Sequence, residues 1–208
     1  MMSIIPFWTL EGTIDIALLQ PQDMTADILG ATLAKINRFN GRTPQPWSVA
    51  SHSVLVSYLV RLELAPWALL HDAHEAFLGD ITFPAVELLS LCGTRVAVQN
   101  ALSNAKGRLD RSIGAAWGVS VRSMSLEMRW ADFIALKAEA SALLGTPHEL
   151  TSAVDIEAHD EAVALISDLP SVWQDARDLW VERVAHYTRM GLLTPPQFSH
   201  PTSMPLAG

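Results

Sequence analysis

Four side chains of the metal-ligating type occur at three points of this 208-residue sequence, namely His52, the adjacent pair His71-Asp72, and Asp132. The pair follows the apolar run 67–70, where an unpaired carboxylate is costly to bury. One shared divalent ion removes that cost, and mixed imidazole and carboxylate ligands suit Zn, Co, Mn, Fe or Ni better than Mg. The sequence therefore predicts a transition-metal site (Zn, Co or Mn, with Mg a poorer fit). A lone His52 would instead be interpreted as a hydrogen-bonded core histidine, so the prediction depends on all four residues together.

Two further carboxylates lie close to this set. Glu75 comes four residues after His71 and three after Asp72, so on a continuous helix it projects from the same face. Asp80 follows Gly79, where the helix is predicted to stop, and can turn back over the pocket. A carboxylate beside a metal can deprotonate a water or protonate a leaving oxygen. Glu75 and Asp80 are therefore the predicted catalytic residues; the alternative is a solvated glutamate and a capping aspartate.

Basic side chains are few but clustered, at 35–42 and at 94–130. Arg38 is the predicted phosphate ligand, because a guanidinium matches phosphate oxygens in a bidentate way and its helix leads into the loop before His52. Phe39 offers a flat apolar surface to a sugar or base. The other basic residues are interpreted as solvated helix faces. The remaining histidines are interpreted as structural or surface residues: His74, His148, His159, His186 and His200.

The elements that must position these residues are helices. Apolar periodicity and N-cap residues such as Thr25 and Ser48 predict helices at about 25–38, 48–59, 66–77, 84–91, 95–117, 123–144, 156–167 and 172–190. Ser171 and Gln174 are predicted to form a capping box for the last helix. Residues 1–24 read as an irregular lead-in with at most one edge strand at 14–16, and 195–208 as a loose Pro-rich tail. We therefore expect an all-α fold with one domain over 25–194 and about seven helices.

Charge and composition exclude several classes of protein. The chain has 22 acidic and 14 basic side chains and a net charge of -8, which argues against stable nucleic-acid binding. The single Cys92 excludes an internal disulfide and a cysteine zinc site. The chain lacks a recognisable signal peptide and an apolar run of about 20 residues that could span a membrane. These observations predict a cytoplasmic protein that does not bind membranes.

The segments 37–42 (NRFNGR), 47–53 (WSVASHS) and 68–80 (ALLHDAHEAFLGD) together resemble the HD-domain metal-dependent phosphohydrolases, over residues 28–144. The branch is that of the bacterial 5′-deoxynucleotidases and phage dATP triphosphohydrolases. The resemblance implies an HD-domain helical bundle, a dimer or larger homo-oligomer, and Glu75 and Asp80 as pocket carboxylates. It also implies that Arg38 grips phosphate and that Phe39 packs against deoxyribose and disfavours a 2′-hydroxyl. The four metal ligands that it implies are His52, His71, Asp72 and Asp132.

One departure concerns phosphate binding. Relatives often have lysine where this sequence has Val86, so the predicted replacement contact is Lys106, Arg108 or a neighbouring subunit. The expected function is removal of phosphate from small 2′-deoxynucleotides, as a monophosphate 5′-nucleotidase or a dATP-type triphosphohydrolase. Two alternatives remain, namely hydrolysis of another phosphate ester or anhydride, such as a cyclic nucleotide or an alarmone, and a non-catalytic HD regulatory module.

Overall fold

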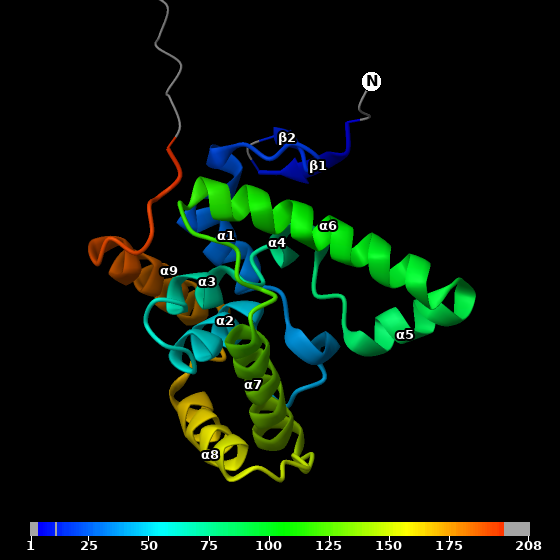
Figure 1. Ribbon diagram of the computed structural model, residues 1–208. Helices are drawn as coiled ribbons and strands as arrows, with labels where there is room; N and C mark the ends of the chain where they lie inside the picture. The colour runs from blue at the N-terminus through cyan, green and yellow to red at the C-terminus, as the bar shows by residue number, and fades with distance from the viewer. Residues whose placement is uncertain (1–3, 11, 198–208) are drawn as a thin grey trace, which may run out of the picture.

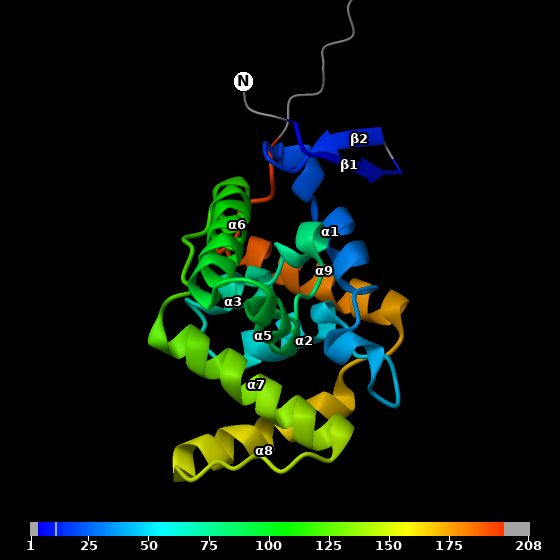
Figure 2. The same ribbon diagram turned by 90° about the vertical axis from the view of Figure 1, so that its right-hand side faces the viewer.

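The structure is a computed structural model that describes residues 4–10 and 12–197, and it consists mainly of α-helices (Figures 1 and 2). This confirms the predicted all-α fold class. The elements are β1 (Pro6–Thr9), β2 (Gly12–Asp15), the 3-10 helix η1 (Pro21–Met24), α1 (Ala26–Leu33), the 3-10 helix η2 (Arg38–Gly41), α2 (Val49–Tyr58), α3 (Ala65–Leu70), α4 (Glu75–Leu78), α5 (Phe83–Cys92), α6 (Arg95–Ala116), α7 (Leu126–Leu144), α8 (Ala153–Asp168) and α9 (Trp173–Arg189).

The N-terminal segment is more regular than predicted. Strands β1 and β2 form an antiparallel hairpin in which Phe7 faces Ile14 across the ladder. The expectation of an irregular lead-in with a single edge strand is therefore wrong. Phe7 also packs edge-on against Phe77 of α4, with ring centroids 6.4 Å apart, so the hairpin is attached to the helical body. The hairpin and α8 lie at opposite ends of the molecule in both views (Figures 1 and 2).

Helix α2 is the central element of the core. Every residue from Val49 to Ser57 is buried, and the helix packs against α3, α7, α8 and α9. Its start agrees with the prediction, since the Ser48 hydroxyl accepts a hydrogen bond from the amide of Ser51. Thr25 caps α1 in the same way through Ile28. A helix buried on all sides holds any polar side chain it carries in a fixed, water-poor environment, which applies here to His52.

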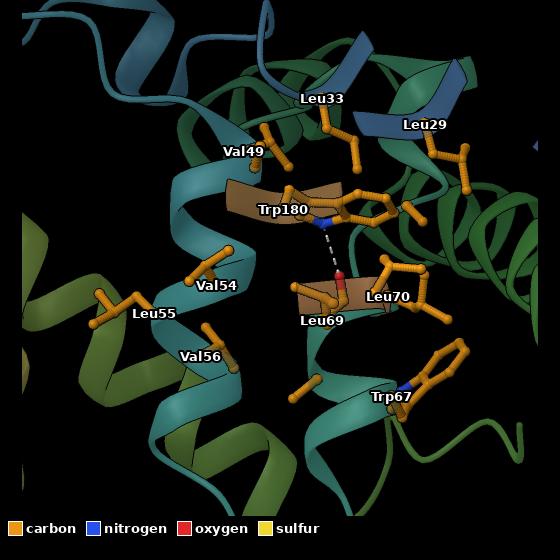
Figure 3. Packing of buried hydrophobic residues seen from close by; sticks show 14 of the residues in the cluster. Leu29, Leu33, Val49, Val54, Leu55, Val56, Trp67, Leu69, Leu70 and Trp180 are labelled. Atoms are coloured by element: carbon orange, nitrogen blue, oxygen red, sulfur yellow. Dashed lines mark hydrogen bonds between the residues drawn. The ribbon is translucent and has the colours of Figure 1, made fainter. Parts of the chain in front are cut away.

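Trp180 of α9 joins the central helices (Figure 3). Its indole is fully buried, and its Nε1 donates a hydrogen bond to the carbonyl oxygen of Leu69 at 3.3 Å. Truncation of a buried tryptophan costs about 3–5 kcal/mol, because both transfer energy and packing are lost. This contact fixes α3, and with it the turn that follows α3, against the core.

Three predictions about the helices are wrong: one end, one continuous helix and one capping box. Helix α1 stops at Leu33, not near Arg38, because the chain leaves the helix to pair with residues 47–48: the Arg38 amide donates to the carbonyl of Trp47 at 2.8 Å. The predicted helix 66–77 is divided into α3 and α4. Helix α9 has Val172 as its N-cap with no side-chain cap bond, so the Ser171–Gln174 capping box does not form. Most of the predicted tail, residues 198–208, lies outside the described residues.

Helices α5 and α6 form an arm on one side of the bundle. Figure 1 shows α5 and the adjoining end of α6 extending away from the other helices, while α7 and α8 pack together at the bottom of the view. Nothing in α5 is buried, whereas the last third of α6 enters the core through Leu109 and Ile113. The predicted site residues lie between α2, the α3–α4 turn, α6 and α7.

Candidate metal centre

The structure brings the four predicted metal ligands together. His52 Nε2 lies 3.2 Å from Asp132 Oδ1 and 3.6 Å from Asp72 Oδ2, and His71 Nε2 lies 3.2 Å from Asp72 Oδ2. His71 Nε2 is also 3.8 Å from Asp132 Oδ1, and the two imidazole centroids are 5.3 Å apart. The histidines are buried and Asp72 nearly so, whereas half of the Asp132 side chain is exposed. The centre therefore has a buried side and an open side.

Contacts at Nδ1 orient the imidazoles of both His52 and His71. His52 Nδ1 is 2.7 Å from Glu139 Oε1, and His71 Nδ1 donates to the carbonyl oxygen of Ala68 at 2.7 Å. A donor at Nδ1 leaves a lone pair on Nε2. Among the residues that the structure describes, neither Nε2 atom has a hydrogen-bond partner. Two buried nitrogen lone pairs that face two carboxylates are the environment of a metal ion, so these residues could hold one.

The turn between α3 and α4 explains how adjacent His71 and Asp72 both reach the centre. In a continuous helix the Asp72 amide would bond to the Ala68 carbonyl, but the His71 imidazole occupies that oxygen. The following amides form shorter bonds, from Ala73 to Leu70 and from Glu75 to Asp72. The side chain of His71 thus ends α3, and the tight turn directs both members of the pair to one side.

Glu139 is a site residue that the sequence did not identify as one. Its side chain is fully buried, with one oxygen on His52 Nδ1 and the other accepting from Arg38 Nε at 3.0 Å. Burial raises the pKa of Glu139, but the charges of Arg38 and His52 outweigh it and lower the pKa below its usual value. The available signal was its spacing, because Glu139 lies two turns after Asp132 on the same face of α7.

Arg38 reaches the centre from η2. Besides its bond to Glu139, its Nη1 lies 3.9 Å from Asp72 Oδ2, and 12% of its side chain is exposed. Burial lowers the pKa of Arg38, but the negative charges of Glu139 and Asp72 outweigh burial and raise the pKa above its usual value, so the guanidinium stays charged. Phe39 lies beside it with a φ of 54°, a left-handed conformation that is uncommon for a bulky residue. Its ring centroid is 5.8 Å from the Arg38 guanidinium carbon.

Burial and nearby charges raise the pKa values of several groups at the centre. Burial lowers the pKa of His71, but the neighbouring carboxylates of Asp72 and Asp132 outweigh it and hold the pKa well above its usual value. Burial, followed by repulsion from Asp72 and Asp80, raises the pKa of Glu75 to about 8. Burial also raises the pKa of Asp80. The carboxylates of the site thus exceed the positive charge that the protein itself provides.

Of the two residues predicted as replacement contacts, the structure brings only Lys106 to the site. Lys106 Nζ lies 4.0 Å from Glu75 Oε1. Arg108, two residues further along α6, is exposed and donates instead to the carbonyl oxygen of Ala17 at 3.0 Å. The prediction for Arg108 is wrong, because two positions along a helix differ by about 200° in direction and cannot both face one pocket.

A cavity of about 560 Å³ opens beside the centre. Its lining includes His71, Asp72 and Asp132, and three basic side chains, Lys106, Arg111 and Arg129, which are together called the basic wall here. Arg111 and Arg129 are exposed, in agreement with the prediction of solvated helix faces, and they line the cavity as well. Apolar side chains complete the lining: Ile81, Val86, Leu102, Val121, Met124 and Met128. The cavity therefore combines residues that could hold a cation with basic groups and apolar side chains.

His74 lies beside the centre. Its burial and the 2.9 Å contact of its Nδ1 with Asp110 agree with the predicted structural or surface role, but it also lines the same cavity, which the sequence did not indicate. Ligand atoms of Asp72, His74 and Glu75 lie within 4.8 Å of one another. The helical spacing used to place Glu75 was wrong, since the chain turns at 71–74, although Glu75 does lie beside Asp72. His200 lies outside the described residues.

Comparison with known proteins adds one relative. No protein-family model matches the chain. Over 121 residues the chain is 32% identical to the uncharacterized protein YfdR of Escherichia coli (strain K12), and the match covers 58% of this chain and 62% of YfdR. The chain thus spans less than two thirds of that relative. Within the described residues, no helix combines the length and apolar character needed to cross a membrane.

Proposed function

We propose that the protein is a metal-dependent phosphohydrolase of the HD-domain class that acts on small 2′-deoxynucleotides. The observation that carries the proposal is the pair of buried Nε2 atoms on His52 and His71, which face Asp72 and Asp132 beside a cavity that three basic side chains also line. The resemblance of the segments around Arg38, His52 and His71 to HD phosphohydrolases supports the same reaction class. The match to YfdR does not bear on the chemistry.

The ligand set fits one divalent ion held by His52, His71, Asp72 and Asp132. Two nitrogen and two oxygen donors favour Zn, Co or Mn over Mg, which prefers an all-oxygen environment. When bound, such an ion lowers the pKa of a coordinated water and polarises a phosphoryl oxygen. The half-exposed Asp132 lies on the cavity side, so a substrate can approach the ion from the cavity.

The protein's own groups bind the phosphate and manage protons. Arg38 is held by Glu139 and can direct its remaining donors to non-bridging phosphate oxygens, where it stabilises developing charge. Lys106 approaches the same place from α6. Glu75 is buried beside both and is positioned to hold or release a proton, with Asp80 as a second carboxylate. Arg111 and Arg129 extend the positive surface along the cavity, which favours anionic substrates.

Phe39 is the residue proposed to distinguish deoxyribose from ribose. Its backbone is held in the left-handed region within η2, which places the ring next to Arg38. A sugar attached to a phosphate on Arg38 therefore meets the ring, and a 2′-hydroxyl buried there would lose its hydrogen bonds to water. Phe39→Ala should bring the rates on deoxynucleotides and ribonucleotides closer together. Equal rates on both in the wild-type protein would refute this role.

The test of the proposed function is an activity screen in the presence of Zn, Co, Mn or Mg. All common mono- and triphosphate nucleotides, in ribo and deoxy forms, are assayed with separate detection of phosphate, pyrophosphate and triphosphate. Asp72→Ala should lose both bound metal and turnover. Glu75→Ala should keep the ion held by the two histidines and lose most turnover. Asp168→Ala, an exposed aspartate at the end of α8, is the control, and full activity of Asp72→Ala would sink the proposal.

A further inference from the structure

We infer that His74, together with Glu75 and a shared Asp72, holds a second divalent cation next to the first. The inference deepens the proposed function, because it rests on Asp72 being a ligand of the first ion. It gives a role to His74, which that function does not use. The ligand atoms of the three residues lie within 4.8 Å of one another. Ligands at about 2.0–2.2 Å from one ion are at most about 4.4 Å apart, so small side-chain movements suffice.

The orientation of His74 is that of a metal ligand. Its Nδ1 binds Asp110 Oδ1 at 2.9 Å, and Asp110 is itself buried. A hydrogen on Nδ1 leaves the lone pair on Nε2. This Nε2 atom is buried and, within the part of the chain that the structure describes, has no hydrogen-bond partner. His52 and His71 show the same pattern, with Nδ1 bound to an oxygen and Nε2 free toward the centre.

Glu75 also has a buried oxygen without a hydrogen-bond partner among the described residues. This oxygen is Oε2, whereas Lys106 Nζ lies 4.0 Å from Oε1. The buried, unpaired Glu75 oxygen and the buried, unpaired His74 nitrogen are each costly without a cation. Asp72 belongs to both ligand groups. A carboxylate shared in this way is suited to bridge two ions, which lie about 3.5–4 Å apart in two-metal phosphatase sites.

A second cation would change the roles of Glu75 and Asp80. Glu75 becomes a ligand, and Asp80, half-buried beside it, is the carboxylate left to exchange a proton with the substrate. The cavity lined by His74, Lys106 and Arg111 then lies directly at the second ion. A phosphate seated there is contacted from the first ion, the second ion and the basic wall, which suits a substrate with several negative charges.

The experiment measures how many Mn(II) ions each chain binds, with inorganic Mn(II) as the probe. Protein is stripped with a chelator, and binding is followed by calorimetry and by electron paramagnetic resonance. The wild-type protein should bind two ions per chain and show the spectrum of an exchange-coupled pair. His74→Ala should bind one ion and show an uncoupled spectrum. His186→Ala, a histidine of α9 away from the centre, should bind two.

Asp110→Asn provides a second test that leaves His74 in place. Because it replaces the charged acceptor that orients the imidazole by a neutral amide with a single acceptor oxygen, it should weaken the second ion about 10- to 100-fold and leave the first unchanged. Circular dichroism and thermal unfolding establish that each variant is folded, and if His74→Ala is not, Asp110→Asn decides. One ion in the wild-type protein, or two retained in His74→Ala, overturns the inference. A His74→Ala protein that loses turnover but no metal also overturns it, since His74 then contacts the substrate.

Failure of this inference is distinguishable from failure of the proposed function. If the wild-type protein binds one ion, His71→Ala abolishes it and nucleotides are hydrolysed, the function stands and the second site is refuted. If the wild-type protein binds no divalent ion at all, both are refuted. If it binds two and both depend on Asp72 but no nucleotide is hydrolysed, the two-metal centre stands and the proposed substrate is wrong.

Discussion

Replacement of Glu139 by glutamine tests whether the group behind His52 supports the metal centre. Glu139 is fully buried and accepts from two donors, His52 Nδ1 at 2.7 Å and Arg38 Nε at 3.0 Å. Glutamine has nearly the same shape but only one acceptor oxygen, so its amide group must face one of the two donors. The variant thus removes one charged hydrogen bond and the negative charge that neutralises Arg38, without leaving a cavity.

The expected loss of unfolding free energy for Glu139→Gln, in the presence of chelator, is about 2–4 kcal/mol. The lower value corresponds to one hydrogen bond to a charged group, about 1.5–3 kcal/mol, and the upper to a broken buried ion pair, about 3–5 kcal/mol. The full pair value is not expected, because Asp72 remains 3.9 Å from Arg38. Metal affinity should fall about 10- to 100-fold, since the charged acceptor behind His52 Nδ1 is lost.

The sign of the pH dependence follows from the lowered pKa of Glu139. A carboxylate whose pKa is depressed by folding stabilises the protein fully above its unfolded pKa, about 4.3, and loses this contribution as the pH falls through the folded pKa. The difference between wild type and Glu139→Gln should therefore be full at neutral pH and shrink in acid.

Urea unfolding at several pH values and calorimetric titration with Mn(II) or Zn(II) measure both effects. The control is Glu157→Gln, at an exposed position of α8, which should change the unfolding free energy by less than about 0.5 kcal/mol. If Glu139→Gln were as stable as wild type and bound metal equally well, Glu139 would have no supporting role, and the interpretation of His52 as a ligand oriented from Nδ1 would be wrong.

Three further predictions concern packing, pH and the basic wall. Gly114→Ala should destabilise the protein by about 1–3 kcal/mol in urea unfolding, since the new Cβ would lie 2.9 Å from a backbone oxygen. Gly107→Ala on the same helix is the control, because its Cβ would meet only the flexible end of an arginine at 3.4 Å. It should stabilise the protein by up to about 1 kcal/mol. In protein kept metal-free with a chelator, the raised pKa of His71 contributes stability that is full below about pH 6.5 and is lost as the pH rises through the folded pKa. The melting temperature of the metal-free protein should therefore fall in alkali more than that of the metal-loaded protein. The double variant Arg111→Gln/Arg129→Gln should raise KM for a nucleotide triphosphate about tenfold with little change in kcat, and an unchanged KM would remove both residues from the substrate site.

Much of the fold follows from local sequence signals. The hydroxyls of Thr25 and Ser48 cap the helices as predicted, and the long apolar periods give α6 to α9 to within a few residues. These signals act within one or two turns of chain, so they are visible in sequence. The hairpin was missed because Pro6–Thr9 carries no alternating pattern of its own and pairs only with the strand that follows.

The errors occur where a side chain or a distant segment competes with helical hydrogen bonding. His71 ends α3 by occupying the Ala68 carbonyl, and Arg38 leaves α1 because its amide bonds to Trp47. Neither competition is visible from propensity, since both histidine and arginine are acceptable within helices. The metal ligands could be selected because their side-chain chemistry is rare in an apolar core. Glu139 had only its spacing from Asp132 as a signal, because its partner His52 is 87 residues away, and the contact of His74 joins it to a residue 36 positions away.

The charges around the centre connect the acidic composition to the need for a cation. Asp72, Glu75, Asp80, Asp132 and Glu139 bring five carboxylates to one region, against the fixed positive charges of Arg38 and Lys106. The raised pKa values of His71 and Glu75 both follow from this excess of negative charge, because a proton on either group lessens it. A divalent ion would offset this excess of negative charge and would displace protons when it binds. Low pH and a chelator should therefore both favour loss of the ion. The basic wall then faces a centre whose own charge is balanced, and an anionic substrate can enter in spite of a net charge of -8 on the whole chain.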